Sequence, residues 1–370
     1  MSNREPTIRV WIYTTSGKRI EVMDYTSVYA ETLLSDIGNG TLVLFDDDIV
    51  LQQISVGDRI RIYWNWLDRN AKQVNVFDGI ITGFRRLYTT KSVIVLLEHI
   101  NRFTKAQIAY FEKTAQSNKN MAGDKAMTEY VNENIGQASN NVLRGNGDVR
   151  ADRTSLNLSV STAIANAPIW EGEKSYQSLL DTINEIADTT QTEWMITSSG
   201  VRQYLFTAKH PFYGADRRSD IRLSECLGNV AFIEGVEDYS NRATLSYAIG
   251  SGEGENKLFS IKSTTDHLVI PELDTEVTAD GNDQDTQNSI DTVAMTGLAE
   301  NKGSFETEIE LDENIIFGRD LYLGDVFTAR EPYTNKTQDF EVVGTSISAS
   351  GDDGIQLRII YTIYPRIKNG

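Results

Sequence analysis

The feature that most limits how this chain can fold is a block of sequence that occurs twice, near the two ends of its 370 residues. The first copy spans residues 54–98 and the second spans residues 321–363. Each copy has an apolar residue followed by Gly-Asp, at Gly57-Asp58 and at Gly324-Asp325, and then an alternating strand. A repeat of this size indicates one structural unit that is used twice.

Two further strands complete each copy in the same order. The second strand begins at an aromatic residue, Phe77 or Phe340, and carries a glycine, Gly83 or Gly344. The third strand reads SVIVLLE in the first copy and IQLRIIYTI in the second. Alternation of apolar and polar residues is typical of strands with one buried face. The repeat therefore predicts two related β-barrels in one chain, and a doubled barrel is one way of building a ring.

The rest of the chain predicts a β-rich α+β protein with three parts. Short alternating runs separated by glycines predict the first β-barrel over residues 1–100. A change to helical periodicity, with helices expected within 101–138 and over 174–188, predicts an inserted α+β domain over residues 101–210. Strand patterns resume over residues 222–365, which form the second barrel. A loop and a helix interrupt this barrel at about residues 266–302.

Composition excludes several classes of function. The formal net charge is −18, whereas general binding to nucleic-acid phosphate needs clustered lysine and arginine. The chain lacks an apolar run long enough for a membrane-spanning helix, and its N-terminus lacks the apolar core of a signal peptide. Cys226 is the only cysteine, so no intrachain disulfide can form, which fits assembly in a reducing cytoplasm.

Motifs for metal or cofactor chemistry are not found in the sequence. His99, His210 and His267 lie far apart and lack the tight spacing of zinc ligands. The glycine-rich string GSGEGE at residues 250–255 precedes a strand pattern, which favours a hairpin turn over a phosphate loop. ADGNDQD at residues 279–285 lacks the glycine and glutamate positions of a calcium loop and is expected to be solvated. We predict no catalytic, cofactor-binding or metal-binding residues, and therefore no enzyme.

Two other classes of function remain open at this point. Exposed aromatics, with Trp11, Trp64, Trp66 and Trp170 as candidates, could form a carbohydrate- or receptor-binding module. Trp64 and Trp66 share one face of a strand, where barrel packing or an interface is the favoured interpretation. A peptidoglycan or polysaccharide hydrolase would need two carboxylates in one cleft, and the sequence places no such pair.

The layout resembles a known family, the tail hub proteins of bacteriophages, over nearly the whole chain. These proteins are related to the baseplate hub of contractile tails and to the N-terminal part of siphophage tail-associated proteins. The resemblance is carried by VGDRIRIYW and FDGIITGF in the first barrel, SYQSLLDTINEIA in the insertion, NRATLSYAIGSGEG, and LYLGDVFTARE in the closing barrel.

The resemblance implies a specific architecture. Both barrels would be similar to the tail-tube fold, and a homotrimer would form a pseudo-hexameric ring. One face of the ring would stack on the hexameric tail tube or distal tail protein ring, and the other would meet a central tip, spike or fibre protein. DNA would pass through the lumen without sequence-specific binding, at the tip of a virion tail assembled in the host cytoplasm. The net charge of −18 further suggests an acidic lumen that repels the DNA backbone. The sequence does not decide between a long flexible and a contractile tail.

Overall fold

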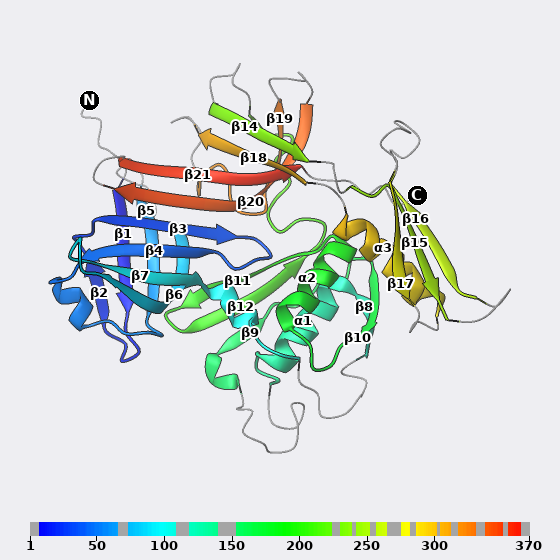
Figure 1. Ribbon diagram of the computed structural model, residues 1–370, viewed down its shortest axis with the longest axis horizontal. Helices are drawn as coiled ribbons and strands as arrows, with labels where there is room; N and C mark the ends of the chain where they lie inside the picture. Colours follow the sequence, from blue (N-terminus) through cyan, green and yellow to red (C-terminus); the bar gives the residue numbers. More distant parts are fainter. Residues whose placement is uncertain are drawn as a thin grey trace.

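The chain is described from a computed structural model. It describes residues 7–65, 73–108, 118–139, 153–223, 230–238, 242–251, 257–264, 275–281, 286–301, 304–311, 317–330, 337–350 and 354–363. The fold is β-rich, with a large sheet, three small sheets and three α-helices in this part of the chain (Figure 1). Among the described residues, no helix is both long and apolar enough to cross a membrane.

The N-terminal strands form one part of the large sheet. They are β1 (Thr7–Tyr13), β2 (Arg19–Val22), β3 (Ser27–Leu33), β4 (Asn39–Phe45), β5 (Arg59–Asn65), β6 (Val74–Leu87) and β7 (Ser92–His99). Burial alternates along β2, β3 and β4, because each of these strands buries one face against the core and turns the other outward. A short 3₁₀ helix, η1 (Ile49–Gln52), is capped by Asp48, whose Oδ1 accepts a hydrogen bond from Val50 N at 2.8 Å.

The C-terminal strands continue the same sheet rather than forming a separate one. They are β13 (Arg222–Leu223), β14 (Val230–Asp238), β18 (Ser304–Leu311), β19 (Val326–Arg330), β20 (Thr337–Ser350) and β21 (Gly354–Ile363). The 13-stranded sheet runs β14-β18-β21-β20-β3-β4-β7-β6-β5-β1-β2, with β19 paired to β20 and β13 paired to β19. Strand β20 lies beside β3 (Figure 1), so the two sequence copies share one hydrogen-bonded framework.

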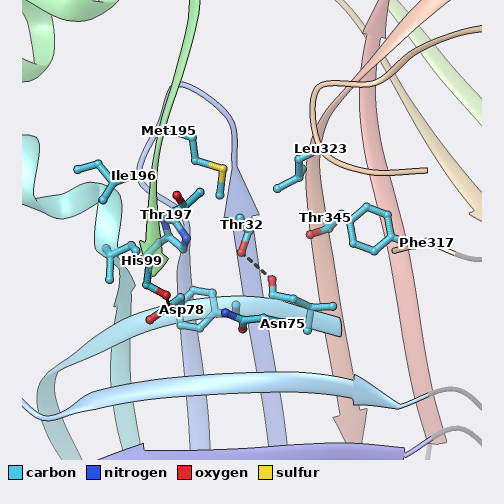
Figure 2. A pocket seen from close by; sticks show the side chains of 14 residues that line it. Thr32, Asn75, Asp78, His99, Met195, Ile196, Thr197, Phe317, Leu323 and Thr345 are labelled. Atoms are coloured by element: carbon cyan, nitrogen blue, oxygen red, sulfur yellow. Dashed lines mark hydrogen bonds between the residues drawn. The ribbon is translucent and has the colours of Figure 1, made fainter. Parts of the chain in front are cut away.

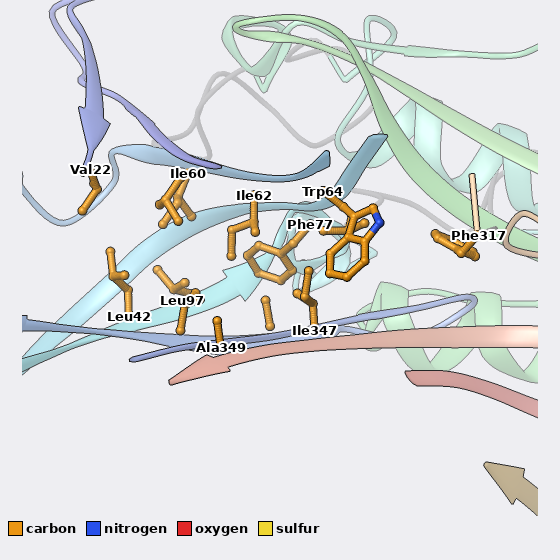
Figure 3. Packing of buried hydrophobic residues seen from close by; sticks show 14 of the residues in the cluster. Val22, Leu42, Ile60, Ile62, Trp64, Phe77, Leu97, Phe317, Ile347 and Ala349 are labelled. Carbon is orange, nitrogen blue, oxygen red and sulfur yellow. The ribbon is translucent and has the colours of Figure 1, made fainter. Parts of the chain in front are cut away.

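A single hydrophobic core fills the concave side of this sheet. Residues from both copies belong to it, among them Ile60, Phe77 and Leu97 from the first and Phe340 and Ile347 from the second. Figure 3 shows Ile347 and Ala349 of β20 across the core from Ile60 and Ile62 of β5. The two copies therefore share one hydrophobic core and do not form separate cores.

An α/β layer packs against both copies from one side. It contains η2 (Ile100–Thr104), β8 (Asn118–Ala122), α1 (Gly123–Asn134), η3 (Thr154–Leu156), β9 (Leu158–Val160), β10 (Ile169–Glu173), α2 (Leu179–Thr190), β11 (Glu193–Gly200) and β12 (Gln203–Lys209). Its core is built on large aromatics, including Tyr130, Trp170 and Trp194, all fully buried. Strands β11 and β12 form an antiparallel hairpin in this layer.

The helices of this layer differ from the sequence prediction at their starts. The helix expected at residue 174 begins at Leu179, because Ser178 caps it by accepting a hydrogen bond from Asp181 N at 3.2 Å. Tyr176, within the expected helix, lies outside the observed one with φ 57° and is exposed. Within residues 101–138, where helices were expected, Asn118–Ala122 form strand β8. Helical periodicity alone does not reveal such boundaries.

A small third layer contains β15 (Leu245–Gly250), β16 (Phe259–Ser263), β17 (Glu276–Gly281) and α3 (Gln287–Glu300). Ala248, Ile290 and Ala294 form its small core. The predicted helix near residue 286 is confirmed as α3. The layer lies between β14 and β18 in the sequence, and strands β15 and β16, which precede the expected interruption, pack in it as well.

Candidate assembly surface

The first Gly-Asp turn is held by one carboxylate that accepts two backbone hydrogen bonds. Asp58 is 1% exposed; its Oδ1 accepts from Thr15 N and its Oδ2 from Ser55 N, both at 2.7 Å. Gly57 has φ 91°, in the left-handed region that favours glycine. The buried carboxylate thus ties the start of β5 to the end of β1.

The second turn repeats this arrangement with different neighbours. Asp325 is 3% exposed; its Oδ1 accepts from Ala215 N at 2.8 Å and its Oδ2 from Tyr322 N at 3.0 Å. Gly324 has φ 78°. Burial raises the pKa of the Asp325 carboxyl, and the two amide donors act in the opposite direction. Both turns therefore place their glycine in the left-handed region.

The strand that follows each turn has the same hydrogen-bond pattern. Gly57 N donates to Ile81 O at 2.9 Å, and Ile81 N donates to Asp58 O at 2.8 Å. In the second copy Gly324 N donates to Val342 O at 2.7 Å, and Val342 N donates to Asp325 O at 3.0 Å. The two segments are therefore equivalent turn-and-strand units.

A register shift marks the same point in both copies. It falls between Ile81 and Gly83 in β6 and between Val342 and Gly344 in β20, as a β-bulge does. The two glycines are equivalent, as the sequence predicts. The pairing of Phe77 with Phe340 is wrong, because Phe340 takes the position of Gly79, two residues further along the strand.

The structural repeat is longer than the sequence repeat. Through the shared register, β14 and β18 correspond to β3 and β4, and β19, β20 and β21 correspond to β5, β6 and β7. Within the large sheet these strands give two four-stranded units of the same order, β14-β18-β21-β20 and β3-β4-β7-β6. Seven residue pairs between β20 and β3, from Gly344–Leu33 to Ser350–Ser27, join the units side by side.

A buried ionic cluster attaches the α/β layer to the first copy. Asp78 Oδ1 accepts from Arg59 Nε at 2.6 Å, and Asp78 Oδ2 accepts from Ser198 Oγ of β11 at 2.6 Å. Arg61 Nε lies 3.2 Å from the same carboxylate, and its Nη2 donates to Gly200 O at 2.6 Å. Buried charges need partners of this kind, so the cluster fixes β11 against β5 and β6.

The second copy meets the same layer through two carboxyl groups. Glu341 of β20 is 2% exposed and faces Glu193 of β11, whose Oε2 accepts from Tyr213 N at 3.0 Å. Burial and the neighbouring Glu193 carboxylate raise the pKa of Glu341 well above its usual range, which keeps a proton on this pair. The equivalent residue of the first copy is Ile80.

A cavity of about 160 Å³ lies where both copies and the α/β layer meet (Figure 2). Thr32, Asp78 and His99 line it from the first copy, Met195 from β11 and Thr345 from β20. Burial lowers the pKa of His99 to about 4, so the ring is neutral at physiological pH and its Nδ1 accepts from Asn101 N at 3.2 Å. Ser198 also lines the cavity, and its hydroxyl donates to the Asp78 carboxylate, which Arg59 and Arg61 contact as well.

The remaining sequence candidates are not brought together. His210 Nδ1 lies 3.0 Å from Gln191 O, and His267 lies outside the described residues, as does Cys226. In the part of the chain that is described, no group of histidine, cysteine, aspartate and glutamate side chains could hold a metal. Ala279 to Gly281 belong to β17, whereas residues 282–285 and most of GSGEGE are outside the described ranges.

The tryptophans do not form an exposed platform where they are described. Trp64 is 5% and Trp170 0% exposed, while Trp66 lies outside the described residues. Trp11 packs against Tyr63, with ring centroids 4.8 Å apart, and Arg19 lies over its ring. These positions give no support to the carbohydrate-binding interpretation.

Comparison with known proteins agrees with the geometry. The sequence matches the family described as Siphovirus ReqiPepy6 Gp37-like protein over residues 9–359. No curated protein matches it. Its fold is similar to that of the 43 kDa tail protein of prophage MuSo2 from Shewanella oneidensis, with TM-score 0.61 and 11% identity over 97% of this chain and 99% of that one.

Two further solved structures have a similar fold. The tail protein from Neisseria meningitidis MC58 gives a TM-score of 0.59 at 13% identity, with 96% of each chain covered. The prophage tail protein gp18 from Listeria monocytogenes EGD-e gives 0.57 at 9% identity, over 97% of this chain and 95% of that one. The chain therefore belongs to the siphovirus ReqiPepy6 Gp37-like family, and its fold is similar to that of prophage tail proteins.

Proposed function

We propose that this chain is the structural hub of a phage tail, without enzymatic activity. Three copies form a ring with two tube-like barrels each, which together imitate a hexamer. One face of the ring stacks on the hexameric tail tube or distal tail protein ring, and the other binds a central tip, spike or fibre protein. The hub lies at the virion tail tip after assembly in the host cytoplasm, and DNA leaves through its lumen.

The observation that carries this proposal is the pair of equivalent four-stranded units in one sheet. The two units match each other in the order of their strands along the sequence and in the order of their strands across the sheet. Both units also carry the Gly-Asp turn and the bulge. A chain with two equivalent units supplies six such units in a trimer. That number matches a hexameric tube while the ring itself keeps threefold symmetry for the tip.

The outward face of the large sheet supports a lumen that repels DNA. Core residues such as Val28 and Ala30 alternate along β3 with Tyr29 and Glu31 on the opposite face. β20 places Ser346 and Ser348 next to these residues, in register with Glu31 and Tyr29. Strand β18 carries glutamate at three alternate positions, Glu306, Glu308 and Glu310. Acidic residues outnumber basic ones at these positions, where Arg358 of β21 pairs with Ser346 and Glu310, so this face carries little for the DNA backbone to bind.

The mass of the native assembly tests the proposed function. Light scattering and native mass spectrometry of the purified protein, together with its stoichiometry in intact tails, should give three copies of the 41.4 kDa chain. Purified tails should contain three copies of it for the six tube subunits of one ring. A dimer, tetramer or hexamer in assembled tails would overturn the hub assignment.

A further inference from the structure

A groove of about 440 Å³ lies where the α/β layer meets the third layer. Its walls are β10 with α2 on one side and β17 with α3 on the other, and these elements lie next to one another in the fold (Figure 1). Thr189 of α2 and Thr296 of α3 share a hydrogen bond, with 2.9 Å between their hydroxyl oxygens, which joins the two walls. The groove lies outside the two repeated units, so the proposed ring does not account for it.

The groove follows the edges of strands and not the face of a sheet. Successive residues of a strand point to opposite faces. Nevertheless, consecutive residues line the groove from each wall, Glu171 to Lys174 at β10 and Thr278 to Asp280 at β17. A space that touches consecutive residues must run beside the backbone. Among the described strands, β10 pairs with β8 alone and β17 with β15 alone, so each wall presents an open edge.

The pairing of β17 with β15 shows which backbone groups face the groove. The two strands are parallel, with Tyr247 opposite Thr278, and Leu245 N donates to Thr275 O at 3.2 Å. In a parallel pair, the residues of one strand turn their backbone polar groups alternately toward the partner and away from it. The N–H and C=O of Thr278 therefore point away from β15 and toward the groove. Backbone groups along an open edge are a ready template for another strand.

Short side chains leave room for a backbone to approach these edges. Paired strands lie only about 4.7–4.9 Å apart, so bulky residues at the edge would keep a new strand away. Thr278 and Ala279 line the groove from β17, Gly172 lines it from β10, and Ser289 and Gly297 line it from α3. The groove is therefore open to a main chain along its whole β17 wall.

The charge of the groove is strongly negative. Its charged lining residues are five acids and one base, namely Glu171, Glu173, Glu185, Asp280, Glu300 and Lys174. Lys174 Nζ lies 2.6 Å from Glu185 Oε2, so this base is already paired. Glu171 and Glu300 form no ion pair or hydrogen bond with any residue that the structure describes. Complementarity therefore favours a basic occupant. A second copy of this chain, with a net charge of −18, is a poor source of one.

We propose that this groove binds an extended, basic segment of another protein. The segment adds a strand to the open edge of β17 and directs lysine or arginine side chains to Glu171 of β10 and Glu300 of α3. Strand addition takes its affinity from main-chain hydrogen bonds and its specificity from side chains at alternate positions. β10 has 5 residues and β17 has 6, so a segment of about five residues, roughly 17 Å long, spans the groove.

Peptide binding to the purified full-length protein tests the site. The probe is a fluorescein-labelled peptide of about eight residues that alternates lysine with threonine, and its binding is followed by fluorescence anisotropy at low salt. A peptide that alternates glutamate with threonine should bind at least roughly tenfold more weakly. A lysine-threonine peptide with N-methyl groups on its backbone amides keeps its charges but cannot donate main-chain hydrogen bonds. It should also bind at least roughly tenfold more weakly.

Two double variants locate the complex. Glu171→Lys with Glu300→Lys should weaken binding of the lysine-threonine peptide by at least roughly tenfold. The matched control, Asp24→Lys with Asp47→Lys, reverses two exposed carboxylates of the first copy and changes the net charge by the same amount. It should keep the affinity within about twofold of the natural chain. Hydrogen exchange of the natural chain, which needs no variant, should slow at the amides of β17 when the peptide is bound.

Several results would overturn this inference. Equal binding of the N-methylated peptide would exclude strand addition, because charge alone would then explain the complex. Equal losses in the groove variant and in its control, or slowed exchange outside β17 only, would place the peptide elsewhere. No binding of the lysine-threonine peptide at millimolar concentration would remove the site. Self-association of the natural chain that the groove variant abolishes would make a second copy the occupant. These measurements do not depend on the number of copies in the ring, so the groove and the hub assignment fail separately.

Discussion

The two copies of the repeated unit share their backbone contacts but not their surroundings. Asp78 and Asp339 occupy equivalent strand positions, and each pairs with arginine. The Asp78 side chain is 6% exposed beneath the α/β layer, whereas that of Asp339 is 38% exposed and contacts Arg218. The first copy contacts the layer through a buried ionic cluster, whereas the second contacts it through the Glu341–Glu193 pair. The backbone framework is thus what the repeat keeps, and side chains adapt to local roles.

The largest contrast is expected between the two aspartates. Asp78→Ala would leave the Arg59 guanidinium buried without its carboxylate, and such changes cost about 3–5 kcal/mol. Asp339→Ala removes a partly exposed pair, where losses are about 1 kcal/mol or less. Denaturant unfolding of the two variants measures the free energies. Equal losses at both positions would show that the layer does not depend on the buried cluster.

The two turn glycines should also differ, by a smaller margin. Gly57→Ala places a Cβ where nothing lies within 4 Å, so only the left-handed backbone is strained, by about 1–2 kcal/mol. Gly324→Ala adds a Cβ 2.5 Å from Gly214 N and 2.6 Å from Tyr213 Cβ. We expect the loss of stability to be greater at Gly324, by about 1–3 kcal/mol for the overpacked contact. A larger loss of stability for Gly57→Ala than for Gly324→Ala would contradict the view that the two turns have the same backbone and differ only in their neighbours.

The smallest contrast depends on pH. It concerns Glu341, which in the second copy occupies the position of Ile80 in the first. The folded-state pKa of Glu341 is raised above the ordinary value of 4.5, so folding takes up a proton at neutral pH. Stability from this group is present below about pH 4.5 and is lost as pH rises toward the folded pKa, by at most about 1.4 kcal/mol for each pH unit.

Glu341→Gln cannot ionise and should therefore unfold at a higher temperature than the natural chain at pH 8, with the gap closing near pH 4. Thermal melts across this range provide the measurement. The difference in melting temperature between Glu341→Gln and the natural chain could instead fall from pH 4 to pH 8. That result would show that Glu341 is ionised when folded. The control Ile80→Val should shift stability equally at all pH values, because no proton is involved.

The sequence was sufficient for the turns because their requirements are local. Gly57-Asp58 and Gly324-Asp325 each need positive φ and a carboxylate three residues after an amide donor, and both features lie within one short motif. The equivalence of β3 with β14 could not be read, since Tyr29 and Glu234 share no side-chain property. It is defined by backbone pairing with strands distant in sequence.

The contacts between layers were missed for the same reason. Ser198 is 120 residues from Asp78, and Glu193 is far from Glu341, so no local pattern links them. Phe77 and Phe340 are both aromatic and buried, but their pairing with Ile62 and Phe327 places them two positions apart. Patterns of residue type predicted the strands, whereas hydrogen-bond register decided how they correspond.

A reconstruction of the tail tip by electron cryo-microscopy, computed with threefold symmetry only, tests the symmetry argument most directly. The account predicts that the strands after Asp58 and Asp325 occupy alternating positions at equal radius, about 60° apart around the axis. Density in which the two strands lie at different radii or in different layers of the tip would contradict it.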